Sequence, residues 1–276
     1  MRTPRVPVTA VLRWWPHRLI NYQKVVHRLV VLALPFLIGL GWLTLLISPA
    51  YPRYAYGRPD LPPDTVYDSP DLAAAGLIPL SPAERLDLAL ETVAFLQSWQ
   101  PPEVAVVLLA DQRLPHTGAP LYNERELAHM VDVKRLTDRI RYLALLAAVI
   151  VVGGLLWLLR QPLRQAQCRP YTRPSGYLAL GRGGLLTLLL LGGLTTLIGL
   201  GWPFFFYQFH GLFFAAGTWS FAPGDSLMRL YPERFFFEFA LLVSFGAWLW
   251  GLLAAVAGYG LAWRSAGAKE AEPDVV

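Results

Sequence analysis

The sequence is poor in charge and almost without cysteine. Only 16% of its 276 residues are charged, 55% are hydrophobic, and Cys168 is the single cysteine. Soluble domains average about 25% charged residues, so this composition indicates a membrane protein. Cys168 has no partner for an intrachain disulfide and is expected to be a reduced bystander.

Acidic residues are absent from two stretches, residues 1–28 and 160–182, although both contain several Arg or Lys residues. Most Asp and Glu residues lie instead between residues 60 and 138. Because cytoplasmic loops are enriched in Lys and Arg, both basic stretches and both termini are expected on the cytoplasmic side of a bacterial plasma membrane. The net charge of +5 is therefore interpreted as a topology signal and not as nucleic-acid binding.

Four apolar runs are long enough to cross a hydrocarbon core of roughly 30 Å, which takes about 20 residues. They predict an all-α membrane protein with a bundle of four transmembrane helices, in which paired glycines allow close helix contact. The expected division of the chain is 1–28 cytoplasmic N-terminus, 29–48 first span, 49–141 extracytoplasmic cap, 142–159 second span, 160–182 cytoplasmic basic loop, 183–202 third span, 203–234 extracytoplasmic aromatic loop, 235–261 fourth span and 262–276 cytoplasmic tail. The first span is expected to be an uncleaved anchor, and the end of the chain from Arg264 to be disordered.

The cap carries signals for helices and for a short hairpin. Ser81, followed by Pro82 and by Glu84 three residues later, predicts a capping box at the start of an amphipathic helix. The stretch "EVAVVLLADQRLPHTGAPLYN" predicts two short strands joined by a turn near Gly118. Asn123 is then expected to cap the next helix, which has acidic residues in its first turn. The predicted cap therefore combines helices with one small β-hairpin.

Two of the five histidines stand out. His17 and His27 fall on the cytoplasmic side and His116 in the expected turn, whereas His129 and His210 lie outside, next to span ends and among apolar residues. His129 begins an apolar stripe at helical spacing that continues through Val133, Leu136, Ile140 and Leu143, with Lys134, Arg135, Asp138 and Arg139 largely outside it. The stripe predicts that His129 faces the protein interior. Two neighbouring imidazoles could exchange protons near neutral pH, because their ordinary pKa is about 6.5.

Most other catalytic signatures are missing from the sequence. It contains no HExxH, GxSxG or P-loop pattern. A serine nucleophile in the outside loops stays open as an alternative, although none of the candidates sits in a recognisable elbow: Ser81, Ser98, Ser220 and Ser226.

Two blocks of the sequence resemble those of a known family. "YNERELAHMVDVK", followed about 80 residues later by "FHGLFFAAGTWSFAPGDSLMRLYPERFF", is similar to the signature blocks of the bacterial lipoprotein intramolecular transacylases. The shared positions are Glu126, His129, Met130, Asp132, Val133, Lys134, Phe209, His210, Trp219, Asp225, Pro232, Phe235 and Phe236. The chain departs from the family pattern just before Trp219, where Ala216, Gly217 and Thr218 replace an asparagine and an acid.

The resemblance implies a four-span acyltransferase with an extracytoplasmic active site. Such enzymes move one acyl chain from the diacylglyceryl group of a lipoprotein's N-terminal cysteine to that cysteine's α-amino group. The implied partners are a diacylated lipoprotein substrate and membrane lipids. No cofactor and no metal are expected, because an amide is more stable than an ester and the reaction runs downhill.

The resemblance also suggests roles for individual residues. His129 and His210 are expected to share the proton transfers, with Asp132 or Glu126 orienting His129 and with Trp219 and Asp225 holding the second outside loop in place. Two alternatives stay open at this point. One is a zinc-dependent membrane hydrolase that uses both histidines and a carboxylate, and the other is a non-catalytic lipid-binding or assembly protein.

Overall fold

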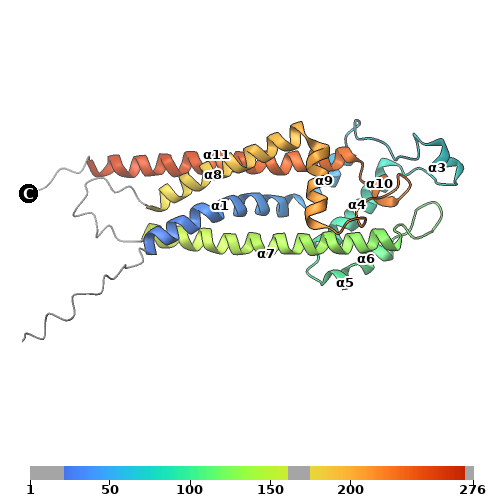
Figure 1. Ribbon diagram of the computed structural model, residues 1–276, viewed down its shortest axis with the longest axis horizontal. Coiled ribbons are helices and arrows are strands. Elements are labelled where there is room, and N and C mark those ends of the chain that lie inside the picture. The colour runs from blue at the N-terminus through green and yellow to red at the C-terminus, as the bar shows by residue number, and fades with distance from the viewer. Residues whose placement is uncertain (1–21, 161–174, 271–276) are drawn as a thin grey trace, which may run out of the picture.

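The computed structural model describes residues 22–160 and 175–270, which form helices joined by loops. Four long helices run side by side along the long axis of the molecule (Figure 1). They are α1 (Tyr22–Leu46), α7 (Glu124–Arg160), α8 (Ser175–Leu200) and α11 (Glu233–Glu270). The shorter helices of the described part gather mainly at one end of the bundle: α2 (Ala50–Tyr56), α3 (Pro70–Ala74), α4 (Pro82–Gln97), α5 (Pro102–Ala105), α6 (Val107–Ala110), α9 (Trp202–Phe213) and α10 (Ser226–Leu230).

The four long helices are each long and apolar enough to cross a membrane, which confirms the expected number of spans. Their outward faces carry large exposed apolar side chains, among them Leu45, Val149 and Leu189, each at least two-thirds exposed. In water such faces would be strongly unfavourable, whereas in a bilayer they contact acyl chains. The protein is therefore a membrane protein.

Glycines bring α8 and α11 into backbone contact. A Cβ added to Gly184 would lie 2.3 Å from the backbone nitrogen of Ala255, and one added to Gly258 would lie 2.2 Å from the nitrogen of Gly181. No real side chain fits at such distances, so only glycine allows these two helices to approach this closely. This contact holds α8, which leads into α9 and His210, against α11.

The N-terminus of α4 has the capping box that the sequence predicts. The Ser81 hydroxyl accepts a hydrogen bond from the Glu84 backbone N–H, and the Glu84 carboxylate accepts one from the Ser81 N–H. The His116 Nε2 lies 3.1 Å from the same carboxylate and ties the loop between α6 and α7 to this helix. Ser81 is thus used in a structural contact.

Two cations from α7 cap the other end of α4. The Lys134 ammonium is completely buried and donates to the Ser98 carbonyl at 2.7 Å, and Arg141 donates to the Leu96 carbonyl at 2.9 Å. Asp138 pairs with both cations. Positive charge is favourable at a helix C-terminus, where carbonyl groups lack partners within the helix.

The stripe expected on α7 is partly wrong. His129 is buried as predicted, but Lys134 and Arg141 are buried too, whereas Leu143 is 53% exposed. The prediction assumed that charged residues face water and apolar residues face the protein. Here the inner face holds cations that have partners on α4, and the outer face continues into the apolar surface of a membrane span.

The expected β-hairpin is also wrong. Its first predicted strand forms the short helices α5 and α6, and only an isolated bridge between Arg113 and Pro120 remains of the pairing. Pro102 stands in the first helical turn, a position that suits proline. Ala105 and Leu109 are fully buried on one side of this segment. A short apolar run does not by itself distinguish a strand from a buried helix.

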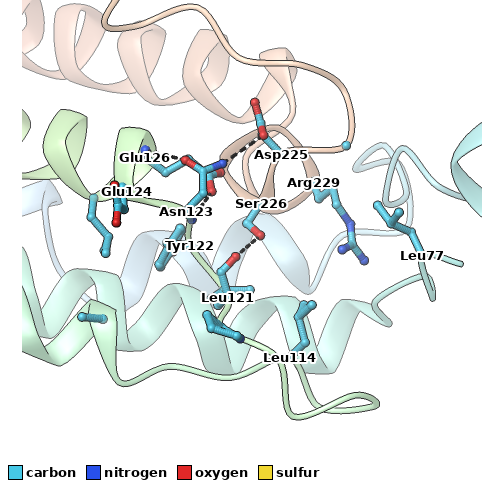
Figure 2. A pocket seen from close by; sticks show the side chains of 14 residues that line it. Leu77, Leu114, Leu121, Tyr122, Asn123, Glu124, Glu126, Asp225, Ser226 and Arg229 are labelled. Atoms are coloured by element: carbon cyan, nitrogen blue, oxygen red, sulfur yellow. Dashed lines mark hydrogen bonds between the residues drawn. The ribbon is translucent and has the colours of Figure 1, made fainter. Parts of the chain in front are cut away.

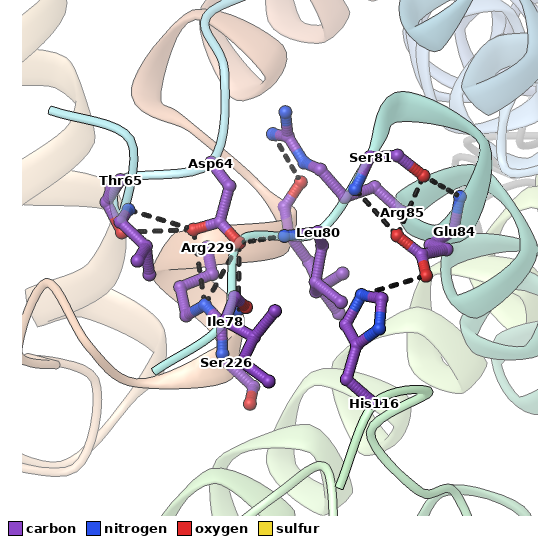
Figure 3. A network of polar contacts seen from close by, with 12 residues as sticks. Asp64, Thr65, Ile78, Leu80, Ser81, Glu84, Arg85, His116, Ser226 and Arg229 are labelled. Atoms are coloured by element: carbon purple, nitrogen blue, oxygen red, sulfur yellow. Dashed lines mark hydrogen bonds and ion pairs between the residues drawn. The ribbon is translucent and has the colours of Figure 1, made fainter. Parts of the chain in front are cut away.

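A buried ion pair anchors α10 to the rest of the cap (Figure 3). The Asp64 carboxylate, fully buried, accepts hydrogen bonds from the backbone N–H groups of Val66 and Leu80. The Arg229 guanidinium lies 2.8 Å from the same carboxylate and also donates to the Ile78 carbonyl at 2.7 Å. Both charges are thereby compensated, as burial requires.

Some expectations fall on residues that the structure does not describe. These include the basic residues up to 21 with His17, the greater part of the loop between α7 and α8 with Cys168, and the last residues of the chain, 271–276. The stretch expected to be disordered from Arg264 onward is helical through Glu270, because α11 extends to that residue.

Candidate active site

The structure brings His129 and His210 together, although 80 residues separate them in the sequence. His129 lies near the start of α7, before its apolar stretch, and His210 lies on α9, which runs across the end of the bundle (Figure 1). The two rings are nearly parallel, with centroids 6.5 Å apart and planes at 21°. The two imidazoles are therefore close enough to act on one reacting group.

Aromatic side chains surround the two histidines. Phe214 and Phe221 contact the edge or face of His129, with ring centroids at 5.0 and 5.3 Å. Phe206 lies 4.0 Å from His210 and Trp219 lies 5.0 Å from it. These rings exclude water from the histidines, so charge on either imidazole is disfavoured.

The hydrogen bonds of the two imidazoles differ. The Nδ1–H of His210 donates to the Phe206 carbonyl at 2.8 Å, which leaves the lone pair on Nε2. The Nδ1 of His129 is buried and has no hydrogen-bond partner among the described residues. Neither Nε2 has a partner in this part of the chain, and neither is completely enclosed. Both Nε2 atoms can therefore meet a substrate.

Burial keeps both imidazoles neutral. Desolvation lowers the pKa of His129 to about 4, the nearby His210 contributes in the same direction, and Asp132 opposes the shift. Desolvation also lowers the pKa of His210, and the hydrogen bond to Phe206 partly offsets it. At neutral pH each ring is thus in its basic form and can accept a proton.

Glu126 does not hydrogen-bond His129. It is almost fully buried, and with Asn123 it forms a second capping box: Asn123 accepts from the Glu126 N–H at 3.0 Å, and the Glu126 carboxylate accepts from the Asn123 N–H at 2.8 Å. Its other oxygen accepts from the Leu227 N–H on α10. Burial raises the pKa of Glu126, and these hydrogen bonds counteract it. Glu126 therefore joins the helix of His129 to the loop that follows His210.

The two candidate aspartates lie apart from the histidine nitrogens. Asp225 accepts hydrogen bonds from Asn123, from Arg125 and from the Ala222 backbone N–H. It therefore fixes the segment between α9 and α10 against α7. Asp132 pairs with Arg135 at 2.7 Å on the surface. Neither hydrogen-bonds an imidazole, and Asp132 acts on His129 only through its charge.

Serines in the outside loops also have structural partners. Ser226 donates to the Leu121 carbonyl and is buried (Figure 2). The Ser98 hydroxyl accepts from the Gln100 N–H. Neither lies in a contact with His129 or His210, so neither is placed as an activated nucleophile.

An open pocket of about 630 Å³ lies beside Glu126, which is one of its lining residues (Figure 2). Apolar residues such as Leu77 and Leu114 line it together with Asn123, Glu124 and Asp225. Neither histidine belongs to its lining, so this pocket does not hold the reacting groups.

Within residues 22–160 and 175–270 no three His, Cys, Asp or Glu side chains are grouped so that they could hold a metal ion. The carboxylates required by a zinc site, Asp132 and Asp225, are instead paired with Arg135 and Arg125. The donor set around the two histidines therefore does not fit a zinc hydrolase.

Sequence reasoning missed the Phe206 carbonyl and the rings of Phe214 and Phe221. The spacing of Phe206 four residues before His210 is a usable signal, because it places a backbone acceptor one helical turn away. Phe214 and Phe221 come from a loop without periodicity, so no pattern marks which of its aromatic residues contact His129.

Comparisons with known proteins show what the chain is similar to. Residues 104–236 match the model of the family described as lipoprotein intramolecular transacylase Lit, and this range includes both histidines. A protein from Aquifex aeolicus, named only as uncharacterized, is 27% identical over 141 residues, which make up 51% of this chain and 58% of that protein. The matched part thus spans little more than half the length of that relative.

Solved structures match over most of the chain. The membrane-integral lipoprotein intramolecular transacylase Lit from Bacillus cereus is 20% identical and covers 90% of this chain and 97% of its own, with a TM-score of 0.58. A variant of it with one histidine replaced by alanine gives a TM-score of 0.57 at 19% identity, over 88% of this chain and 95% of its own. Residues 104–236 therefore match the lipoprotein intramolecular transacylase family, and the four-span fold is similar to that of its solved structures.

Proposed function

We propose that the chain is an integral membrane acyltransferase that moves an acyl chain from the diacylglyceryl group of a lipoprotein's N-terminal cysteine to that cysteine's own α-amino group. The observation that carries this proposal is the pair of neutral histidines, 6.5 Å apart, within the matched range 104–236. The product is a lipoprotein with one acyl chain on nitrogen and one left on the glyceryl group. The reaction requires no cofactor.

The chemistry needs one proton to move from nitrogen to oxygen. The neutral α-amine attacks the ester carbonyl, and its N–H proton passes to an imidazole Nε2 as the C–N bond forms. The C–O bond to the glyceryl group then breaks, and the resulting oxygen takes a proton from the imidazolium. One ester and one amine become one amide and one hydroxyl, so atoms and charges balance.

His210 is the better placed first acceptor. Its hydrogen bond to the Phe206 carbonyl fixes the tautomer that has the lone pair on Nε2. His129 lies in a drier site, where burial lowers its pKa to about 4. In this proposal His210 passes the proton to the neutral His129, which binds it weakly and delivers it to the departing oxygen.

Glu126 and Asp225 act in this proposal as positioning residues. Glu126 accepts from Leu227, and Asp225 accepts from Asn123 and Arg125, so both acids connect the loop after His210 to α7 near His129. These contacts keep the two imidazoles at a fixed separation. Asp132 contributes only through its charge.

The extracytoplasmic face of the membrane is the proposed site of the reaction. Supporting observations are the basic stretches at one end of the spans and the acidic cap at the other. The helix that carries His210 also exposes apolar side chains, including Phe204, Tyr207 and Leu212, which suit contact with lipid. The ester of a membrane-anchored lipoprotein would lie at this level.

Mass spectrometry of lipoprotein N-termini tests the proposal. The chain is expressed in a bacterial host that makes only diacylglyceryl lipoproteins, alongside the His210→Asn variant. The expected result is a form with an N-acyl group and a monoacyl glyceryl group in the host with the wild-type chain, and none with the variant. Unchanged diacylglyceryl cysteine in the presence of folded wild-type protein would contradict it.

A further inference from the structure

Trp219 is packed against the proposed first proton acceptor. Its ring lies 5.0 Å from His210, with an angle of 37° between the planes. Tyr207 and Phe206 contact its other edges, at 5.6 and 6.5 Å between centroids. The ring is thus held on three sides, and its position relative to His210 is fixed.

The indole N–H of Trp219 has no acceptor. Its Nε1 is buried, and no hydrogen-bond partner for it exists within the described part of the chain. A buried indole N–H ordinarily finds an acceptor, because desolvating a donor without replacing its hydrogen bond is unfavourable. The unused donor next to His210 is therefore available to an acceptor on a ligand that enters beside this histidine.

The proposed reaction creates such an acceptor. When the amine attacks the ester, the carbonyl oxygen becomes an oxyanion, and a fixed donor in a dry site stabilises it strongly. The α7 cations that precede and follow His129 in the sequence are already engaged: Arg125 pairs with Asp225, and Lys134 with Asp138 and the Ser98 carbonyl.

We propose that the Trp219 indole N–H donates a hydrogen bond to the ester carbonyl oxygen of the substrate as that oxygen gains negative charge. This inference rests on the proposed transacylase function and adds a catalytic residue to it. Trp219 then has two roles, because its ring packs on His210 and its N–H serves the oxyanion. No bond to the indole forms or breaks, and its proton stays on nitrogen.

Trp202 provides a matched control. Its Nε1 is likewise buried without a partner among the described residues, and its ring also contacts Phe206, at 5.5 Å. Its other ring contacts are with Phe205 and Phe237, whereas no contact joins it to His210. Replacing Trp202 removes the same chemical group from the same aromatic cluster, at one ring's distance from the histidine.

The test uses the purified full chain in detergent with a synthetic diacylglyceryl-cysteine lipopeptide, and it measures kcat and KM. Trp219→Phe retains an aromatic ring and removes the donor, so kcat should fall about 100-fold while KM changes less than about threefold. Trp202→Phe should keep kcat within about threefold of the wild type. Trp219→His, which retains a ring N–H, should have a kcat at least about tenfold higher than that of Trp219→Phe.

Three outcomes overturn the inference: kcat of Trp219→Phe within threefold of the wild type, an equal loss in Trp202→Phe, or no recovery in Trp219→His. The proposed function fails separately, and it does so if the wild-type chain transfers no acyl group. A wild type that is active, a His210→Asn variant that is inactive and a Trp219→Phe variant of full activity together remove only the role of Trp219.

Discussion

The contact between the start of α7 and the second outside loop has two chemically opposite sides. On the paired side, formed by Asn123, Glu126 and Asp225, the carboxylates and the amide have hydrogen-bond partners. The aromatic side is formed by His129, His210 and Trp219. Here the His129 Nδ1 and the Trp219 Nε1 are buried and have no hydrogen-bond partner in the described part of the chain. Glu126 of the paired side and His129 of the aromatic side lie within one turn of the same helix, α7.

This difference separates the scaffold from the chemistry. Fully satisfied polar groups gain nothing from a ligand, whereas unsatisfied ones next to open nitrogens become satisfied when a polar substrate enters. The aromatic side is therefore expected to determine rate, and the paired side to determine stability and the distance between the histidines.

The largest effect is expected for the aromatic side. His210→Asn and His129→Asn should each lower kcat by about 1,000-fold, because general acid–base transfer by histidine contributes roughly 10²–10⁴. The melting temperature should change little, and His116→Asn, which alters a histidine paired with Glu84, serves as the control. Near-normal acyl transfer by a folded His210→Asn protein would be incompatible with the proposed proton transfer.

Breaking the buried pair that anchors α10 should act on stability. Asp64→Ala leaves the Arg229 charge buried without its carboxylate and should lower the free energy of unfolding by about 3–5 kcal/mol, measured by thermal melting in detergent. The activity of the remaining folded fraction should stay near that of the wild type. Asp60→Ala, in an exposed pair with Arg234, should lower the stability much less, and an equal loss in both variants would deny a special role to the buried pair.

The pH dependence of stability should sharpen the contrast. The pKa of His129 is about 4 in the folded protein and about 6.5 in the unfolded chain, so between these values the unfolded chain binds more protons. Stability therefore falls as the pH decreases from 6.5 to 4, by up to about 1.4 kcal/mol per pH unit from this residue. His129→Asn should flatten that slope in pH-dependent melting curves, and an unchanged slope would mean that His129 is not desolvated.

Glu126→Gln should have a moderate effect on the paired side. Glutamine has one carbonyl oxygen, so it cannot accept from both Asn123 and Leu227 as the carboxylate does. We expect a loss of about 1–3 kcal/mol in the free energy of unfolding and a lower kcat with little change in the slope of the pH profile. A kcat of the wild-type value would show that the histidine separation does not depend on this contact.

The smallest effect is expected for Asp132. Its partner Arg135 is exposed, and no hydrogen bond joins it to His129. Asp132→Asn should change stability by less than about 1 kcal/mol and kcat by less than threefold. A loss comparable to that of His129→Asn would instead identify Asp132 as the residue that orients this imidazole.

The sequence predicts the membrane architecture well, because span length depends only on bilayer thickness and hydropathy. Four spans, the capping box at Ser81 and burial of His129 all follow from local patterns that the structure confirms. The β-hairpin fails because a run of seven apolar residues near two prolines is compatible with either helix or strand. The inward burial of Lys134 and Arg141 could not be predicted, since it depends on unpaired carbonyl groups of α4 that only the tertiary structure places beside α7.

The candidate site divides in the same way. The proximity of His129 and His210 follows from the predicted topology together with the family resemblance, because both lie beyond span ends on one side. The contacts of the two acids could not be predicted in this way. Glu126 and Asp132 each lie three residues from His129 along α7, a spacing that suggests contact with the imidazole, but both acids bind other residues instead. The competing donors, Leu227 and Arg135, are visible only in the folded chain.

A crossover experiment with purified protein tests the central claim most directly. Two diacylglyceryl lipopeptides are mixed, one labelled with deuterium in both its acyl chains and its peptide and the other unlabelled, and the N-acylated products are analysed by mass spectrometry. Transfer within one molecule predicts that a labelled acyl group appears only on the nitrogen of a labelled peptide. Mixed products, with a labelled acyl group on an unlabelled peptide, would contradict the account.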